Sequence, residues 1–277
     1  MHSEYIKTIL SKTKLSQQEA IWLLEHISGK KYPFFSDLKL TENQQRMLDD
    51  SIDQISIHHK PLAYVIGWVP FLDLSIAVKP PILIPRAETE EWVHSLIENI
   101  DPYGNQIHTI LEIGTGSGAI GLSLAKHLPK AQILAIDIND QSIELAKSNA
   151  KKNNIQNITF LNSDLFEKIK DQKFDLIVSN PPYIPEDDAS SINPSVINWE
   201  DPKALFSGKK GLDLLEKIVK ESSSYILFNP SLPFQLVLEI DRTQNELLQK
   251  IGYESSWDCS IKKDLFGNWR TAWCKQK

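Results

Sequence analysis

The sequence lacks the features that mark secreted, membrane-spanning or general nucleic-acid-binding proteins. It has only two cysteines in 277 residues, Cys259 and Cys274, so we expect no disulfide framework and interpret both as packing residues of an intracellular protein. No apolar run approaches the roughly 20 residues that cross a bilayer. The first residues resemble neither a signal peptide nor a transit peptide. The formal net charge is −6 without a dense Lys/Arg cluster, which argues against a basic nucleic-acid-binding face.

What the sequence does contain is an alternation of helical and strand patterns. Residues 1–57 are predicted to be helical, with capping boxes at Ser16–Glu19 and Thr41–Gln44. Residues 58–84 are predicted to form a β-hairpin linker with strands at 62–66 and 74–78. From residue 107 onward strands and helices alternate, which predicts a mostly parallel sheet. The stretch 184–210 is predicted to be a long irregular loop, and such loops in compact domains are usually functional or disordered. We hypothesise that it becomes ordered around the substrate.

A glycine-rich turn follows the apolar strand predicted over residues 108–113. Glycine allows positive φ and close backbone approach, so a ligand can lie directly against this turn. The next predicted strand ends at Asp137, 19 residues after Gly118. That is near the interval of about 20 residues expected for a carboxylate that accepts ribose hydroxyls. The pattern predicts adenosine binding, although Asp137 could also simply end a strand. The turn consists of Gly114, Thr115, Gly116, Ser117 and Gly118.

Two acidic residues favour S-adenosylmethionine over a nicotinamide dinucleotide as the ligand of this turn. Glu112 lies on the strand before the glycines, where its carboxylate would repel a pyrophosphate but attract an ammonium group. Asp164 follows a third predicted strand, 157–161, and suits an adenine amine, with Leu165 beside it. The turn itself contains no cationic residue that could hold phosphates.

The chemistry of transfer is indicated by Asn180-Pro181-Pro182-Tyr183, directly after the apolar strand predicted over residues 174–179. Each proline fixes φ near about −65° and removes a backbone N–H, so the loop is rigid and rich in acceptors. Acceptors without competing donors suit a planar NH₂ group, such as an amide or the exocyclic amine of a base. The Asn180 side-chain oxygen and the Pro181 carbonyl could hold its two N–H bonds, with Tyr183 packed against the planar group. The simpler alternative is a proline-rich turn that ends a strand.

Taken together, these motifs resemble the HemK/PrmC family of glutamine N5-methyltransferases of peptide-chain release factors, over roughly residues 60–275. The chain departs from the family pattern at Ala87, where a second proline is common, and at Leu165, where some members have tryptophan. It also has Trp199-Glu200-Asp201-Pro202 where the family commonly has Tyr-Glu-Pro. The resemblance rests on residues 61–67, 84–90, 111–118, 177–184 and 264–270.

The resemblance implies a Rossmann-like methyltransferase fold with a mostly parallel seven-stranded sheet that ends in an antiparallel hairpin. We expect a helical domain at 1–57 that docks the substrate or only stabilises the fold, the linker at 58–84 and the methyltransferase domain at 85–277. No metal site is expected, because His58-His59 has no Cys or carboxylate at ligand spacing. The expected catalytic residues are Asn180, Pro181 and Tyr183. The expected substrate contacts are the same three and Pro182. The expected S-adenosylmethionine contacts are Glu112, Gly114, Thr115, Gly116, Ser117, Gly118, Asp137, Asp164, Leu165 and Asn180.

The activity implied by the resemblance is methyl transfer to the side-chain nitrogen of the glutamine in a release factor's Gly-Gly-Gln motif. Two alternatives stay open: an adenine N6-methyltransferase of nucleic acid that uses the same loop, and a nicotinamide-dependent oxidoreductase built on the same glycine turn. We expect a cytoplasmic monomer that acts on a release factor without binding DNA or a membrane. In a eukaryote the mitochondrial matrix is the alternative location.

Overall fold

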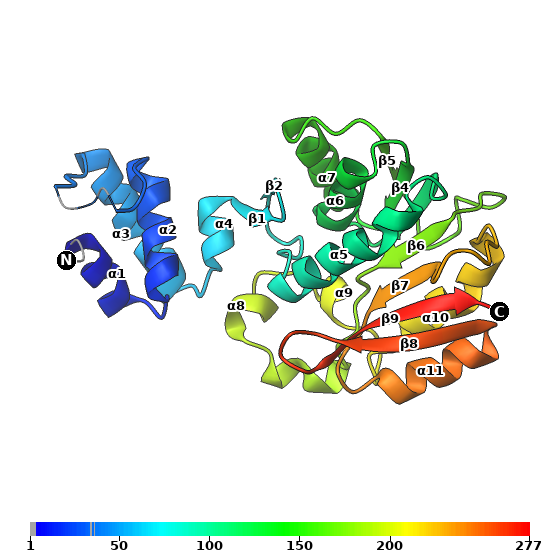
Figure 1. Cartoon of the computed structure of the whole chain (residues 1–277). Helices are drawn as coiled ribbons and strands as arrows, with labels where there is room; N and C mark the ends of the chain where they lie inside the picture. Colours follow the sequence, from blue (N-terminus) through cyan, green and yellow to red (C-terminus); the bar gives the residue numbers. More distant parts are fainter. Residues whose placement is uncertain (1–3, 34, 36) are drawn as a thin grey trace. The chain divides into compact units, whose positions relative to one another are not determined.

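The structure is a computed structural model that describes residues 4–33, 35 and 37–277. It contains two compact units (Figure 1). The first consists of the described residues up to Trp68 together with Ile192–Trp199, and the second of Val69–Ser191 together with Glu200–Lys277. No helix within the described ranges is long and apolar enough to span a membrane.

The first unit is helical, and its helices between Glu4 and Ser56 agree with the prediction for residues 1–57, of which residues 1–3, 34 and 36 lie outside the described ranges. Ser16 Oγ accepts from the Glu19 N–H while the Glu19 carboxylate accepts from the Ser16 N–H, and Thr41 and Gln44 form the second capping box, so both are confirmed. Its apolar core includes Leu23, Leu24 and Leu48. The helices are α1 (Glu4–Lys12), α2 (Gln17–Ser28), α3 (Glu42–Ser56), α4 (Leu62–Ile66) and α8 (Pro194–Ile197).

The strand predicted over residues 62–66 is wrong, because this segment forms α4. It begins after Pro61 and ends at Gly67, whose φ of 87° closes the helix in the left-handed region. Four of its five residues are buried, and a short apolar run of this kind does not distinguish a buried strand from a buried helical turn. The hairpin is therefore confined to β1 (Trp68–Phe71) and β2 (Leu74–Ala77).

The second unit is built on a seven-stranded sheet with the order β5-β4-β3-β6-β7-β9-β8. Strands β3 to β7 pair in parallel, whereas β9 is antiparallel to both β7 and β8. The prediction of a mostly parallel sheet that ends in an antiparallel hairpin is thus confirmed. The strands are β3 (Thr109–Ile113), β4 (Gln132–Asp137), β5 (Ile158–Asn162), β6 (Leu176–Ser179), β7 (Leu236–Glu239), β8 (Trp257–Lys263) and β9 (Trp269–Gln276).

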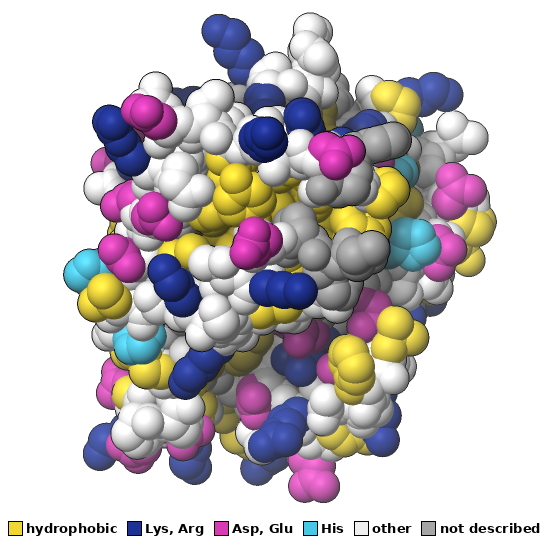
Figure 2. Space-filling view, turned by 90° about the vertical axis from the view of Figure 1, so that its left-hand side faces the viewer, with side chains coloured by type: hydrophobic (Ala, Val, Ile, Leu, Met, Phe, Trp, Pro, Cys, Tyr) yellow, Lys and Arg dark blue, Asp and Glu magenta, His cyan; other side chains and the backbone are white. Residues whose placement is uncertain are grey.

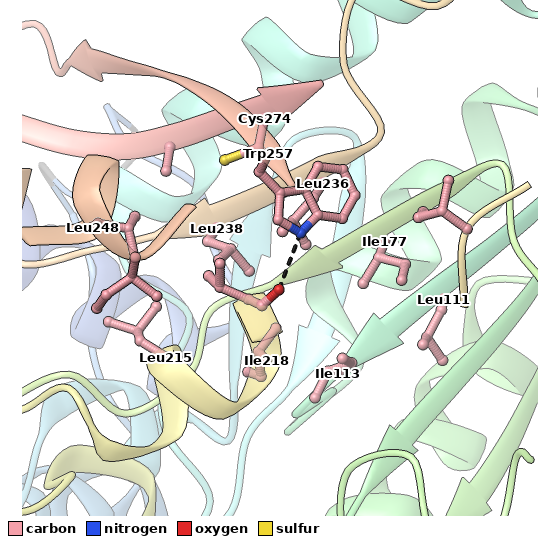
Figure 3. Close-up of a cluster of buried hydrophobic side chains, with 14 of the residues drawn as sticks. Leu111, Ile113, Ile177, Leu215, Ile218, Leu236, Leu238, Leu248, Trp257 and Cys274 are labelled. Carbon is pink, nitrogen blue, oxygen red and sulfur yellow. Dashed lines mark hydrogen bonds between the residues drawn. The ribbon is translucent and has the colours of Figure 1, made fainter. Parts of the chain in front are cut away.

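Helices cover the sheet and bury its apolar side chains. Figure 3 shows Leu215 and Ile218 of α10 and Leu248 of α11 packed beside Leu236 and Leu238 of the interior strand β7. A strand with helices on both faces is expected to be apolar, as Leu236, Val237 and Leu238 are, and the fourth buried residue of β7, Glu239, accepts hydrogen bonds instead. The helices of this unit are α5 (Ala87–Ile100), α6 (Ala119–His127), α7 (Asp140–Lys152), α9 (Pro202–Leu205), α10 (Asp213–Ser222) and α11 (Asn245–Glu254).

The stretch 184–210 is more regular than predicted. It contains a 3₁₀ helix at Glu186–Ser191 and the short helices α8 and α9, and Asn193 and Asp201 cap the two short helices. Ile184 also forms a parallel bridge with Phe206, so the two ends of the stretch lie side by side. Further single turns of 3₁₀ helix are at Asp101–Tyr103 and Ser223–Tyr225.

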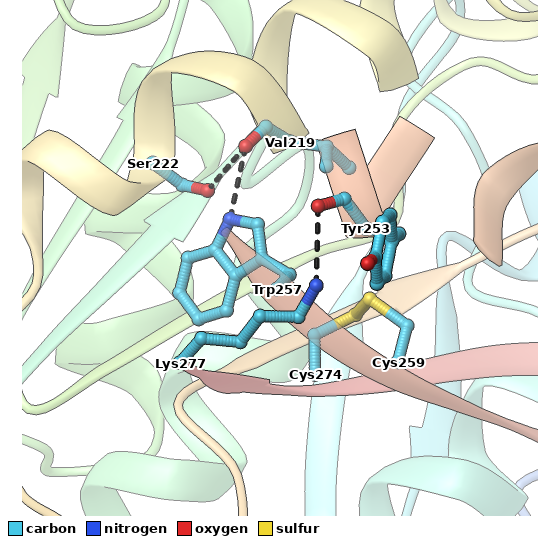
Figure 4. The surroundings of a disulfide bond; sticks show 7 residues. All are labelled: Val219, Ser222, Tyr253, Trp257, Cys259, Cys274 and Lys277. Atoms are coloured by element: carbon cyan, nitrogen blue, oxygen red, sulfur yellow. Dashed lines mark hydrogen bonds between the residues drawn. A yellow bond between two sulfur atoms is a disulfide. The ribbon is translucent and has the colours of Figure 1, made fainter. Parts of the chain in front are cut away.

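The interpretation of the two cysteines as separate packing residues is wrong, because they form a disulfide between the paired strands β8 and β9 (Figure 4). Cys259 and Cys274 are direct partners in the antiparallel register, which brings their side chains together on one face. Beside the bond, Trp257 Nε1 donates to the Val219 carbonyl and Lys277 Nζ donates to the Tyr253 carbonyl. The disulfide therefore closes the hairpin at the edge of the sheet.

We predict that reduction of this disulfide destabilises the protein. The two cysteines are 15 residues apart, and crosslinking a loop of that length stabilises by about 3 kcal/mol in the chain-entropy model. Urea unfolding with and without a phosphine reductant measures the difference. The Cys259→Ser/Cys274→Ser double variant is the control and should not respond to reductant. A wild-type curve that is unchanged by reductant would contradict the prediction.

Candidate active site

The parallel register brings the predicted site residues to one edge of the sheet. Ile113, the last residue of β3, is level with Ile136 of β4 and with Ser179 of β6. The segments that follow β3, β4, β5 and β6 therefore meet, as expected for the carboxyl edge of an open α/β sheet. They border a cavity of about 720 Å³. The predicted residues that line it are Gly114, Gly116, Asp137, Asp164, Leu165, Asn180 and Pro182.

The other predicted residues lie next to the cavity without lining it: Glu112, Thr115, Ser117, Gly118, Pro181 and Tyr183. The structure shows how the first four shape the glycine turn. The Thr115 hydroxyl donates to Glu112 Oε2 at 2.6 Å, and the Gly118 N–H donates to the Thr115 carbonyl at 2.8 Å. The buried Asn149 of α7 donates to the Ser117 carbonyl at 2.9 Å. Asn149 was not predicted from the sequence, although its hydrogen bond to the Ser117 carbonyl fixes the glycine turn to α7.

Asp137 fixes the glycine turn from the end of β4. Its Oδ2 accepts from the Gly116 N–H at 2.8 Å, and its Oδ1 accepts from the Asn139 N–H at 2.9 Å. Burial raises the pKa of Asp137, and the nearby charge of Asp201 raises it further, while the two N–H donors oppose both effects. Each carboxylate oxygen still has a lone pair, so Asp137 can hold the turn and accept ribose hydroxyls together.

Glu112 is a fully buried carboxylate beneath the turn. Burial raises its pKa to about 8, although Thr115 and the Gly121 N–H donate to it. Its Oε1 has no hydrogen-bond partner within the described part of the chain. The expected contact of Glu112 with a cofactor ammonium group stays a prediction, since the side chain does not line the cavity.

The charge of the cavity fits a cationic cofactor. Its lining contains more carboxylates than cations, which favours the sulfonium and ammonium groups of S-adenosylmethionine and disfavours a pyrophosphate. Apolar walls come from Ile82, Leu83 and Ile138, which suit a flat adenine ring. The charged lining residues are Asp137, Asp140, Asp164, Asp201, Asp213, Lys203 and Lys217.

Part of the cavity wall was not predicted from the sequence, because it is formed by residues 81–86 and 200–204, which are far apart in the chain. Arg86 Nη2 forms an ion pair with Glu200, which is 2% exposed, and the Asp201 N–H donates to the Pro81 carbonyl at 2.7 Å. These contacts hold residues 81–86 against residues 200–204 beside the cavity. The only signal in the sequence was the resemblance of residues 84–90 to a family segment, and that resemblance did not indicate Glu200 as the partner of Arg86.

The Asn-Pro-Pro-Tyr loop is held on several sides. Before it, the Ser179 hydroxyl donates to the Ile113 carbonyl at 2.7 Å, and at its end Gln244 Nε2 donates to the Tyr183 carbonyl at 3.0 Å. Asn180 Nδ2 donates to Thr89 Oγ1 at 3.1 Å. The Tyr183 hydroxyl donates to Glu239 Oε1 at 3.0 Å. Burial, and next the charge of Glu239, raise the pKa of Tyr183, so its phenol stays protonated at neutral pH.

We predict that Asp137→Asn weakens binding of S-adenosylmethionine about tenfold or more, which corresponds to at least about 1.4 kcal/mol. The amide NH₂ of Asn would face the Gly116 or the Asn139 N–H, so one donor would lose its acceptor. Calorimetric titration with the cofactor measures the change. Asp171→Asn removes the same charge from an exposed residue outside the cavity and should bind as the wild type does. Equal affinities for all three proteins would contradict the assignment.

We also predict that Glu112 makes the cofactor-free protein less stable as the pH rises. Its ordinary pKa is 4.5 and its folded-state pKa is about 8, so between these values the unfolded chain loses a proton that the folded protein keeps. The free energy of unfolding should fall over this range, and less so in Glu112→Gln, which cannot ionise. Urea unfolding at several pH values tests this, with Glu167→Gln as an exposed control. Parallel pH profiles for wild type and Glu112→Gln would refute it.

Comparison with known proteins identifies the family to which this chain belongs. The family description "Methyltransferase small domain" matches residues 86–198. A release factor glutamine methyltransferase from Thermodesulfovibrio yellowstonii is 32% identical over 265 residues, which cover 95% of this chain and 93% of that protein. One from Lactococcus lactis subsp. lactis is 36% identical over 231 residues, or 83% of this chain and 82% of that protein.

Solved structures support the fold. A ribosomal protein methylase from Lactobacillus delbrueckii subsp. bulgaricus has a TM-score of 0.52 and 24% identity, over 73% of this chain and 85% of that one. A methyltransferase from Pyrococcus furiosus has a TM-score of 0.51 and 18% identity, over 84% of this chain and 98% of that one. The similarity to the curated relatives extends over most of both chains. The protein is thus an S-adenosylmethionine-dependent methyltransferase and belongs to the family of release factor glutamine methyltransferases.

Proposed function

We propose that this enzyme transfers the methyl group of S-adenosylmethionine to the side-chain nitrogen, N5, of the glutamine in the Gly-Gly-Gln motif of a peptide-chain release factor. The observation that carries the proposal is Asn180, which lines the cofactor cavity and uses its NH₂ group to donate to Thr89. Its amide oxygen accepts no hydrogen bond from any described residue. It is thus available to a donor on the substrate.

The reaction requires acceptors, because an amide nitrogen is a poor nucleophile whose lone pair is delocalised into its carbonyl. Asn180 Oδ1 and the Pro181 carbonyl would each accept one N–H of the glutamine amide. That would aim the nitrogen at the methyl group and stabilise the positive charge that develops on it. The Pro181 carbonyl, like Asn180 Oδ1, accepts no hydrogen bond within the described part of the chain.

Alignment on a rigid loop would supply most of the acceleration. Well-oriented groups can lower a barrier by about 7–11 kcal/mol. The two prolines and the contacts of Ser179 and Gln244 restrict the loop before substrate arrives. Methyl transfer itself needs no general base here. Tyr183 keeps its proton, and the proton of the alkylated amide can leave to solvent after transfer.

The same acceptors would also fit the exocyclic amine of an adenine, so methylation of nucleic acid is the second candidate. The charge distribution favours the protein substrate. Carboxylates outnumber cations around the cavity, and on the face drawn in Figure 2 the described Lys and Arg side chains are interspersed with Asp and Glu. Nucleic-acid binding usually relies on a basic surface that contacts phosphates. Docking of the release factor on the helical domain, action as a monomer and a cytoplasmic location are further parts of the proposal.

The proposal predicts that Asn180→Ala lowers kcat by about 10²-fold or more, the usual effect of removing one group that stabilises transition-state charge. Cofactor affinity should stay close to that of the wild type. Peptide mass spectrometry of a release factor incubated with enzyme and S-adenosylmethionine measures both the site and the extent of methylation. Asn99→Ala, on the exposed surface of α5, is the matched control and should be fully active.

A single methyl group on the Gly-Gly-Gln glutamine, absent with Asn180→Ala, would support both substrate and site. If label passes instead to an adenine-containing nucleic acid, the second candidate replaces the first. Full activity of Asn180→Ala on the release factor would show that the methyl-transfer site is wrongly placed.

A further inference from the structure

A chain of hydrogen bonds connects Asn180 to a buried carboxylate on another strand. Asn180 Nδ2 donates to Thr89 Oγ1 at 3.1 Å, and the Thr89 hydroxyl donates to Glu239 Oε2 at 2.7 Å. Thr89 and Glu239 are 3% and 1% exposed, so water does not compete for these bonds. Asn180 lies in the loop that follows β6, Thr89 lies in the first turn of α5, and Glu239 is the last residue of β7.

The direction of each bond in this chain follows from the groups present. Trp92 lies three residues after Thr89 on α5, and its Nε1, which can only donate, donates to the same Glu239 Oε2 at 2.7 Å. Burial raises the pKa of Glu239, whereas the hydrogen bonds from Trp92, Thr89 and Tyr183 and the charge of Arg270 favour its ionised form. In that form the carboxylate can only accept. The Thr89 hydroxyl has a single hydrogen, which it donates to Glu239. Toward Asn180 the hydroxyl can therefore only accept, through a lone pair.

That lone pair determines which end of the Asn180 amide faces Thr89. An amide turned the other way would place Oδ1 against the Thr89 oxygen, acceptor against acceptor, with no hydrogen between them. The NH₂ end must therefore face Thr89, and Oδ1 is turned away from it. In a free asparagine the two ends differ little in shape, so this choice has to come from neighbouring groups.

We propose that Thr89 is a positioning residue for methyl transfer, and that Glu239 directs it by accepting its hydroxyl hydrogen, so that Asn180 presents its oxygen to the substrate amide. The proposal rests on the proposed function, in which Asn180 Oδ1 accepts a hydrogen bond from the glutamine. Thr89 does not line the cofactor cavity, and in this proposal it does not contact the substrate. It acts only through the orientation of Asn180.

The test compares Thr89→Val with Thr89→Ser. Valine has nearly the shape of threonine but no oxygen, so nothing would hold the NH₂ end of Asn180, whereas serine keeps the hydroxyl. We expect Thr89→Val to lower kcat on the release factor about tenfold or more with little change in cofactor affinity. Thr89→Ser should stay within about threefold of the wild type. Equal kcat for Thr89→Val and wild type would overturn the proposal.

A control separates positioning from general stabilisation. Trp92→Phe also removes one donor from Glu239 Oε2, but it leaves the bond between Thr89 and Asn180 in place. Its melting temperature should fall in the same way as that of Thr89→Val, while its kcat falls much less. An equal loss of kcat in both variants would mean that the network only stabilises the fold, and would reject the positioning role.

A measurement without turnover distinguishes failure of this proposal from failure of the proposed function. Melting temperatures are compared for Thr89→Val, Asn180→Ala and the double variant. If the two side chains are bonded as described, the double variant should lose less than the sum of the single losses. Additive losses would overturn the proposal. This outcome does not depend on the substrate, whereas absence of methyl transfer by the wild type would refute the proposed function alone.

Discussion

The site depends on one constraint, the parallel register of β3, β4, β5, β6 and β7. Because these strands run in the same direction and end at the same level, every connection that leaves them starts at one edge of the sheet. The glycine turn, the carboxylate of Asp137 and the Asn-Pro-Pro-Tyr loop meet there although they are distant in sequence. The apolar packing of α10 and α11 against β7 maintains that edge, and with it the cavity.

Two carboxylates, the half-buried Asp137 and the buried Glu239, fix the geometry of this edge. Burying a carboxylate is costly unless donors surround it, so each one fixes the groups that donate to it. Asp137 accepts two backbone N–H bonds and thereby shapes the cofactor turn. Glu239 accepts from Thr89, Trp92 and Tyr183, and thereby connects α5 and β7 to the catalytic loop. The groups expected to contact cofactor and substrate are thus held by a layer of residues that contact neither.

The sequence was sufficient for features that are local to a strand end. The glycine turn, Asp137 and Asn180 were predicted because each directly follows a recognisable apolar strand, and a parallel sheet brings such positions together. The connections of Thr89 with Glu239 and of Arg86 with Glu200 were not predictable, since they join residues 150 and 114 positions apart without a local pattern. The prediction of a strand at residues 62–66 was wrong for a different reason, because a five-residue apolar run fits a helical turn and a strand equally well. The two cysteines were misread since their pairing depends on the register of β8 and β9.

The central claim is that a substrate amide is held by Asn180 Oδ1 and the Pro181 carbonyl with its nitrogen aimed at the cofactor. It is tested most directly by a crystal structure of the enzyme with S-adenosylhomocysteine and a peptide that contains Gly-Gly-Gln. The account predicts the glutamine NH₂ within hydrogen-bond distance of both oxygens, its nitrogen facing the cofactor sulfur, and the Asn180 NH₂ still on Thr89. A glutamine bound elsewhere, or an Asn180 amide that presents its NH₂ group to the substrate, would contradict it.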